Sequence, residues 1–373
     1  MLFAWLGFIA LILVFLALDL GVFHRKAHVV SVKEALTWSA VWITIALVFT
    51  AFIYFGYEKH WLGLGKSLDG TPLDQMAVTE SNPLGELNGS AATIKYLTGY
   101  VIEKSLSIDN IFVIAMIFGF LAVPAVYQHR VLFWGILGAL LMRGVMIWLG
   151  AELIHRYHWI IFVFGGFLIL TGAKMLFMKS EKGDPSNNLI VRLTKRLFPV
   201  TSNFHGQHFF VRAGSGHAHE PAIAGEPERA DAAIDAANIG TLMMTPLFVA
   251  LVLIEFTDLI FAVDSIPAIF AITTDPFIVF TSNVFAMLGL RSLYFALAGM
   301  IDKFRYLKPA LAFVLLLVGV KMLAHKPLKA LLGDYFNFYM LGAILLILVI
   351  GVVASVVSKH RSKEALVAEP VGP

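Results

Sequence analysis

Acidic and amide side chains interrupt two stretches of this sequence that otherwise read as compatible with lipid. The first is LSIDNIFVIAMIF, which contains Asp109 and Asn110. The second is VLIEFTDLIFAVDSIPAIFAI, which contains three carboxylates: Glu255, Asp258 and Asp264. A carboxylate within a membrane span costs about 2.5 to 3.5 kcal/mol on insertion scales, so it is rarely retained unless it faces a partner, a cavity or a cation. These residues therefore indicate a functional site inside the membrane.

The chemical type of these side chains predicts the ion. All are oxygen donors, and the candidate metal ligands are Glu103, Asp109, Asn110, Glu255, Asp258 and Asp264. Carboxylate, amide and hydroxyl oxygens suit Mn²⁺, Mg²⁺ or Ca²⁺, whereas copper and zinc prefer thiolates and imidazoles. The chain has no cysteine, and its histidines fall in predicted loops and at the ends of spans. We therefore expect a divalent cation, Mn²⁺ foremost, as cargo, and no resident cofactor.

Helix geometry limits which of these acids share a site. At 100° per residue, Glu255 and Asp258 lie about 60° apart, while Asp264 lies on the opposite side from Glu255. Pro267 cannot donate to the carbonyl of Val263, and its ring clashes there. We therefore predict a broken helix that turns Asp264 inward toward Glu255 and Asp258.

The composition identifies the elements that carry the site. Of 373 residues, 59% are apolar and 14% are charged, and the mean hydropathy is +0.81, which is typical of a multi-spanning membrane protein. No run of Lys and Arg suggests a nucleic-acid surface. Taking about 20 apolar residues as one crossing, we predict an all-α fold with nine membrane spans, near 1–22, 36–56, 97–120, 131–151, 158–178, 243–273, 280–300, 309–325 and 337–357.

The distribution of Lys and Arg predicts the orientation. With nine spans, most of these residues fall on the side that carries the long segment 179–240 and the C-terminus. The other side carries the slightly acidic segment 58–95. Positive residues favour the cytoplasm, so we expect the N-terminus outside and the C-terminus in the cytoplasm. The 179–240 segment is then a cytoplasmic loop.

An internal repeat relates two thirds of the predicted spans. Asp109, Arg143 and Lys174 recur as Asp258, Arg291 and Lys321, at offsets of 149, 148 and 147 residues. Residues 97–178 and 243–325 therefore form two three-helix units within one transmembrane domain, 1–373. Because three is odd, the second unit is inverted relative to the first, as in many secondary transporters. We expect Asp109 and Asp258 to meet near mid-depth.

Other interpretations of the charged residues stay open. The carboxylates could instead pair with Arg143 and Arg291 to lock helices together, or these arginines could be counter-charges that hold an empty ion site. Lys174 and Lys321, near span ends, are expected to snorkel, and Asp19 is either an accessory ligand or an interfacial acid. The loop histidines could form a metal-capture arm or belong to a linker; they are His205, His208, His217 and His219. Phe209 to Val211 are apolar enough to reach the membrane surface.

Three segments resemble the TerC family of bacterial membrane proteins, and most closely its Alx-type branch: LTGYVIEKSLSIDNIFV, EFTDLIFAVDSIPAIFAITTDPFIVFTSN and LGLRSLYF. The resemblance implies an inner-membrane protein of the LysE-type exporter superfamily, associated with manganese efflux and with responses to alkaline pH or tellurite. It places the family's acidic motif on Glu103, Asp109, Glu255, Asp258 and Asp264. Residues 214–238 depart from the family, because this connector looks longer than usual.

The function expected from these features is export of a divalent metal ion, most of all manganese, with protons as candidate counter-ions. The alternatives are export of another solute, such as a tellurium species or an amino acid, and a membrane scaffold for stress proteins. An anionic substrate would fit poorly beside five acids. The sequence has no G-x-S-x-G, H-E-x-x-H or phosphate-binding loop, so we do not expect an enzyme. The sequence carries no signal for the oligomeric state.

Overall fold

The computed structural model describes residues 1–21, 30–67, 70–157, 159–177, 199–216, 221, 231–297 and 306–367. Within them the chain is mostly helical, as predicted. The long helices are α1 (Leu2–Gly21), α2 (Val32–Glu58), α3 (Gly89–Phe120), α4 (Ala125–Arg156), α5 (Ile160–Phe177), α8 (Pro246–Phe270), α9 (Pro276–Met287), α11 (Leu307–Leu323) and α13 (Phe336–Val367). The shorter elements are η1 (Trp61–Gly63), β1 (Phe210–Arg212), α7 (Ala232–Asp235), β2 (Leu242–Met244), α10 (Leu290–Leu297), α12 (His325–Leu332) and η5 (Gly333–Tyr335).

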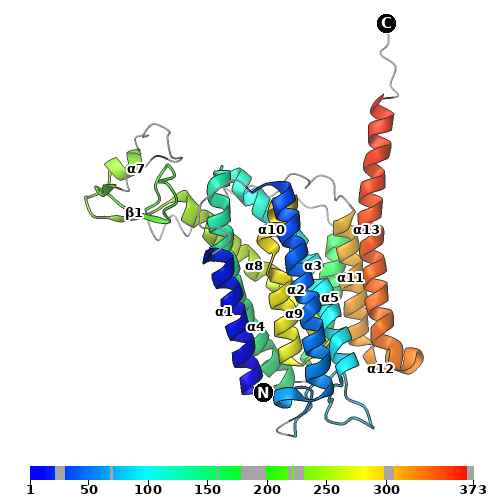
Figure 1. Ribbon diagram of the computed structural model, residues 1–373. Coiled ribbons are helices and arrows are strands. Elements are labelled where there is room, and N and C mark those ends of the chain that lie inside the picture. The colour runs from blue at the N-terminus through cyan, green and yellow to red at the C-terminus, as the bar shows by residue number, and fades with distance from the viewer. Residues whose placement is uncertain are drawn as a thin grey trace.

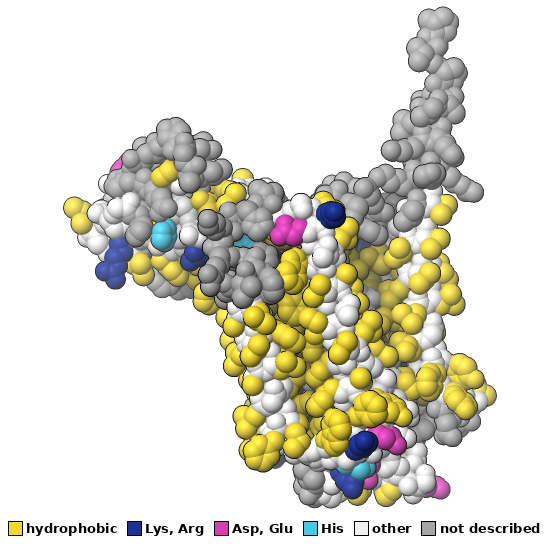
Figure 2. Space-filling view, viewed as in Figure 1, with side chains coloured by type: hydrophobic (Ala, Val, Ile, Leu, Met, Phe, Trp, Pro, Cys, Tyr) yellow, Lys and Arg dark blue, Asp and Glu magenta, His cyan; other side chains and the backbone are white. Residues whose placement is uncertain are grey.

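Six helical segments of the described chain are long and apolar enough to cross a membrane: Val32–Glu58, Ala125–Arg156, Ile160–Phe177, Pro246–Phe270, Pro276–Leu297 and Phe336–Ser355. Leu2–Leu18 is a shorter apolar helix. Figure 2 shows apolar side chains over the sides of the bundle and charged side chains near its two ends, which is the pattern of a membrane-embedded protein. Each of the nine predicted segments overlaps a helix, but the segment 280–300 is divided between α9 and α10, and the count of nine crossings stays a prediction.

The two ends of the bundle carry different parts of the chain. The N-terminus and the segment between α2 and α3 lie at one end, whereas β1, α7 and the last turns of α13 lie at the other (Figure 1). This separation agrees with the grouping that the Lys and Arg residues predict. The direction in which the bundle crosses a membrane stays a prediction.

The central helices of the bundle pack across the two predicted units. In the centre, α3 packs against α9 and α4 packs against α8, while the first helices of the predicted units, α3 and α8, also touch. The third helices, α5 and α11, form the most extensive helix pair. Glycines allow these two helices to approach closely. A Cβ atom on Gly319 would lie 2.9 Å from the carbonyl oxygen of Gly165, so a larger residue would not fit there. The inverted repeat itself stays a prediction.

The helix that carries Glu255, Asp258 and Asp264 is continuous. α8 runs unbroken to Phe270 and has Pro267 in its last turn, so the predicted break at Pro267 is wrong. Pro267 lies so close to the helix end that the missing hydrogen bond to Val263 does not interrupt the axis. Without a break, Asp264 stays on the opposite side of α8 from Glu255, as ideal helix geometry requires.

Candidate central ion site

A buried arginine joins three helices at the centre of the bundle. Arg143 lies well inside α4 and is 2% exposed. Its Nη2 and Nε donate to the two carboxylate oxygens of Asp258 on α8, at 2.8 and 3.1 Å. Its Nη1 also forms an ion pair with Glu103 on α3, which is fully buried. One guanidinium is therefore held between two carboxylates, in the two-pronged geometry that arginine favours.

Polar side chains from the surrounding helices complete this centre. Asn110 Nδ2 donates to Asp258 Oδ1 at 3.2 Å. Arg143 Nη1 also lies 3.3 Å from Ser265 Oγ and 3.5 Å from Asn283 Oδ1. Asn283 lies on α9, and sequence reasoning did not select it. The amide within the apolar helix PFIVFTSNVFAM was the signal that could have found it.

Several buried polar atoms around the centre have no hydrogen-bond partner among the described residues. They are Glu103 Oε2, Ser107 Oγ, Asn110 Oδ1, Glu255 Oε2 and Asn283 Nδ2. The first three follow an i, i+4, i+7 spacing and so share one face of α3. Buried polar atoms without partners are uncommon, and a bound ion or water is one of their ordinary explanations.

A small cavity adjoins this face. It measures about 20 Å³, and Asn110, Thr257 and Asp258 are the polar residues that line it. A cavity of this size holds about one water molecule or a bare ion. The centre thus provides oxygen donors and negative charge, and a small, mostly apolar cavity lies beside Asn110 and Asp258.

Glu255 is at the border of this centre. Its carboxylate packs against Gly138 of α4, where a Cβ atom would lie 1.9 Å from Glu255 Oε1. Asp258 acts on it electrostatically. The structure therefore brings together Glu103, Asn110, Asp258 and, beside them, Glu255.

The other two predicted ligands lie elsewhere. Asp264 accepts a hydrogen bond from Thr171 Oγ1 of α5 at 3.1 Å, and the charged residue acting on Asp109 is Lys308 of α11. Asn110, the neighbour of Asp109, contacts Asp258. Neighbouring residues point about 100° apart on a helix, so Asp109 faces a different direction, and its expected meeting with Asp258 stays a prediction. No group of three or more His, Asp or Glu side chains in the described ranges is arranged to hold a metal ion. Arg143 instead lies between Glu103 and Asp258.

The other basic side chains that the sequence analysis singled out differ in their surroundings. Arg291 contacts His129 Nε2 at 3.2 Å. Lys174 is exposed, as expected. Lys321 does not snorkel: it is 1% exposed and lies 5.5 Å from the ring of Phe336. It is buried because α13 and the start of α3 cover this part of α11.

Three further predictions concern residues at the edges of the described chain. The side chain of Asp19 lies outside the described part, as do His217 and His219. His205 is buried, and its Nε2 lies 3.2 Å from Asp231 Oδ2. This contact is structural and leaves the metal-capture role of the loop histidines a prediction.

A second buried ionic cluster, missed in the sequence, lies at the N-terminal end of the bundle. Asp74 is 0% exposed and forms a 2.6 Å ion pair with Lys95. It also accepts hydrogen bonds from Thr273 and from the backbone N–H of Thr274, at the turn between α8 and α9. Asp74 therefore ties the segment before α3 to both halves of the bundle.

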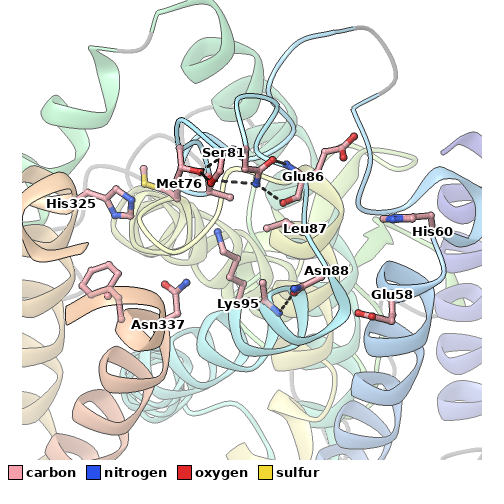
Figure 3. Close-up of a pocket in the computed structure, with 16 residues that line it drawn as sticks. Glu58, His60, Met76, Ser81, Glu86, Leu87, Asn88, Lys95, His325 and Asn337 are labelled. Carbon is pink, nitrogen blue, oxygen red and sulfur yellow. Dashed lines mark hydrogen bonds between the residues drawn. The ribbon is translucent and has the colours of Figure 1, made fainter. Parts of the chain in front are cut away.

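A cavity of about 530 Å³ lies beside this cluster. Figure 3 shows Lys95 in its middle, with His325 and Asn337 on one side and Glu58 and His60 on the other. The end of α2, the segment before α3, the start of α3 and the region from α12 to the start of α13 thus form a polar vestibule at the N-terminal end.

Replacing Asp74 with asparagine is expected to lower the melting temperature at neutral pH, because Lys95 would lose the carboxylate it contacts. Burial alone would raise the pKa of Asp74, but Lys95, Thr273 and the Thr274 N–H outweigh it and lower that pKa. The stability contributed by Asp74 is therefore present above the pKa of an unfolded aspartate and is lost as pH falls through the lower folded value. Melting curves from neutral to acidic pH should converge for wild type and Asp74→Asn. The exposed Asp235→Asn is the control, and equal melting temperatures at neutral pH would contradict the role of Asp74.

Comparison with known proteins identifies the family of this chain. The model of the Integral membrane protein TerC family matches residues 88–363. A relative from Myxococcus xanthus, named "Uncharacterized membrane protein STKORF319", is 47% identical over 85% of this chain and 82% of its own length. One from Escherichia coli (strain K12), named "Putative membrane-bound redox modulator Alx", is 38% identical over 89% of this chain and 90% of its own. No solved structure matches the chain significantly.

Proposed function

Because the chain belongs to the TerC family of integral membrane proteins, we propose that it exports a divalent metal ion, manganese foremost, from the cytoplasm. The proposal places the protein in a bacterial inner membrane, with the N-terminus outside and the C-terminus in the cytoplasm. The observation that carries it is the buried centre of Glu103, Arg143 and Asp258. Around this centre lie oxygen atoms without hydrogen-bond partners and a cavity with room for one small ion.

The charge balance of this centre supports a divalent cargo. Glu103 and Asp258 together carry two negative charges, and the single guanidinium of Arg143 lies between them in this structure. A divalent cation would balance Glu103 and Asp258 completely and would take the place of Arg143 between them. When no metal ion is bound, Arg143 takes its place in this scheme. Its positive charge then compensates the two buried carboxylates.

The ligand chemistry favours Mn²⁺ among divalent ions. Glu103, Ser107, Asn110 and Asp258 would supply carboxylate, hydroxyl and amide oxygens, which are hard ligands. Within the described residues no imidazole takes part in this centre, so zinc and copper would lack their preferred partners. Mg²⁺ keeps its waters more strongly and fits a cavity for one small ion less well.

The direct test is ion flux in sealed vesicles that contain the purified protein. We expect uptake of Mn²⁺ well above protein-free vesicles, weaker uptake of Mg²⁺ and Ca²⁺, and competition of unlabelled Mn²⁺ with the tracer. A panel in which none of these ions moves faster than in empty vesicles would overturn the proposal.

Gly138→Ala tests the part played by Glu255 without altering an acid. The new Cβ would occupy the position of Glu255 Oε1 and push that flexible carboxylate aside. We expect Mn²⁺ flux to fall several-fold while melting temperature changes little, because the end of a side chain moves more readily than backbone. Gly166→Ala on α5 is the matched control, since a Cβ there meets nothing within 4 Å. Unchanged flux in Gly138→Ala would remove Glu255 from the site.

A further inference from the structure

A small module of β1, β2 and α7 projects sideways from the bundle, at the end opposite the N-terminus (Figure 1). The two strands pair antiparallel, with Phe210 opposite Met244 and Arg212 opposite Leu242. Residues directly opposite each other point to the same face of such a pair. One face therefore carries Phe210, Arg212, Leu242 and Met244, and the other carries Val211 and Met243.

The two faces of this pair have different environments. Val211 and Met243 are buried and pack in one cluster with Ile234 of α7. On the other face, Met244 is buried, whereas Phe210 is 40% exposed, Leu242 is 45% exposed and Arg212 is also exposed. We call Phe210, Arg212 and Leu242 the open face. The open face is apolar except for Arg212, and α7 packs against the opposite face of the strand pair.

Contacts with the bundle determine where the open face points. The ring of Phe210 lies 4.4 Å from that of Phe248, in the first turn of α8. Phe209 also contacts Phe248 and lies 5.2 Å from the guanidinium of Arg130 on α4. Thr245, just before α8, donates to the His208 carbonyl at 2.7 Å. These contacts hold the open face on the side of the module that meets the N-terminal end of α8.

This position lies beside the first turn of a candidate membrane span. α8 is one of the six candidate membrane spans, and only Thr245 separates β2 from its first residue, Pro246. Because the module extends beyond the side of the bundle at the end of the spans, its underside faces the region that the lipid headgroups would occupy (Figure 1). Figure 2 shows apolar side chains and Lys or Arg side chains along this underside.

We propose that the open face of the β1–β2 module docks on the membrane surface, with Phe210 and Leu242 at the headgroup–acyl boundary and Arg212 against an anionic phospholipid headgroup. Aromatic and aliphatic side chains beside a basic residue are the combination that holds peripheral segments at anionic lipid surfaces. The assignment also explains why two large apolar side chains stay exposed beside a span. It does not depend on which ion the protein moves.

The chain has no cysteine, so a single introduced thiol can report on this face without background. An environment-sensitive dye on Leu242→Cys is compared with the same dye on Ala232→Cys, an exposed position on α7. Full-length protein is placed in nanodiscs of phosphatidylcholine, with or without phosphatidylglycerol. For Leu242→Cys we expect a blue shift, loss of most iodide quenching and strong quenching by lipids that carry a spin label near the headgroup. For Ala232→Cys we expect none of these.

Arg212→Gln in the labelled Leu242→Cys protein tests the lipid class. We expect it to abolish the added blue shift that phosphatidylglycerol gives while leaving the melting temperature unchanged, since Arg212 is exposed. Equal iodide quenching at the two labelled positions would overturn the proposal. So would protection of Leu242→Cys that increases with protein concentration at constant lipid, because that would indicate a protein surface on the open face.

Discussion

Arg143→Gln is expected to reduce the yield and melting temperature of the protein severely and to abolish Mn²⁺ flux. The substitution leaves Glu103 and Asp258 buried together without the cation that both contact. Removing one partner of a buried ion pair costs about 3 to 5 kcal/mol, and here one residue is the partner of two carboxylates. The measurement is protein yield and thermal unfolding in detergent, beside flux in vesicles.

Two companion variants separate charge from shape. Arg143→Lys keeps the charge but not the two-pronged contact with Asp258, so we expect intermediate stability. A triple variant, Arg143→Gln with Glu103→Gln and Asp258→Asn, removes all three charges and should recover most of the yield while staying inactive. A stable Arg143→Gln protein with wild-type flux would show that Arg143 neither holds the centre nor takes part in transport.

Asp258→Asn is expected to reduce Mn²⁺ flux to the background of empty vesicles, whereas Asp109→Asn should retain most of it. Asp258 contacts Arg143 and Asn110 and lines the central cavity, while Asp109 interacts with Lys308 at a different face of α3. The amide keeps the size of the side chain but loses the charge that compensates a dehydrated divalent cation. The two variants are therefore matched in chemistry and differ in position.

The assay combines flux with a stability control. Asp258→Asn still leaves Glu103 as a partner for Arg143, so we expect a folded protein with a modest loss of melting temperature. Equal loss of flux in Asp258→Asn and Asp109→Asn would show that Asp109 belongs to the site, as the predicted inverted repeat requires. Wild-type flux in Asp258→Asn would remove the central carboxylates from the transport path altogether.

The apolar composition and the acidic residues within apolar runs were sufficient to predict a helical membrane protein with polar residues at its centre. These features are local, because hydropathy and helix periodicity depend only on the order of residues. Ideal helix geometry placed Glu255 and Asp258 on neighbouring faces of one helix and Asp264 on the other side. The predicted break that was to turn Asp264 inward is wrong, and Asp264 contacts Thr171 instead. The family also followed from the sequence, since its motifs are contiguous segments.

The tertiary structure decided which of these residues meet. Asp109 and Asn110 are adjacent in sequence, and the rotation of α3 in the bundle, which neighbouring helices set, brings Asn110 to Asp258. Packing likewise buries Lys321 beneath α13 and places Arg143 between two acids from different helices. The link from Asp74 to Lys95 and to the turn at Thr273 and Thr274 joins parts of the chain up to 200 residues apart. Such contacts depend on helix rotation and on distant segments, which the local pattern of a sequence does not contain.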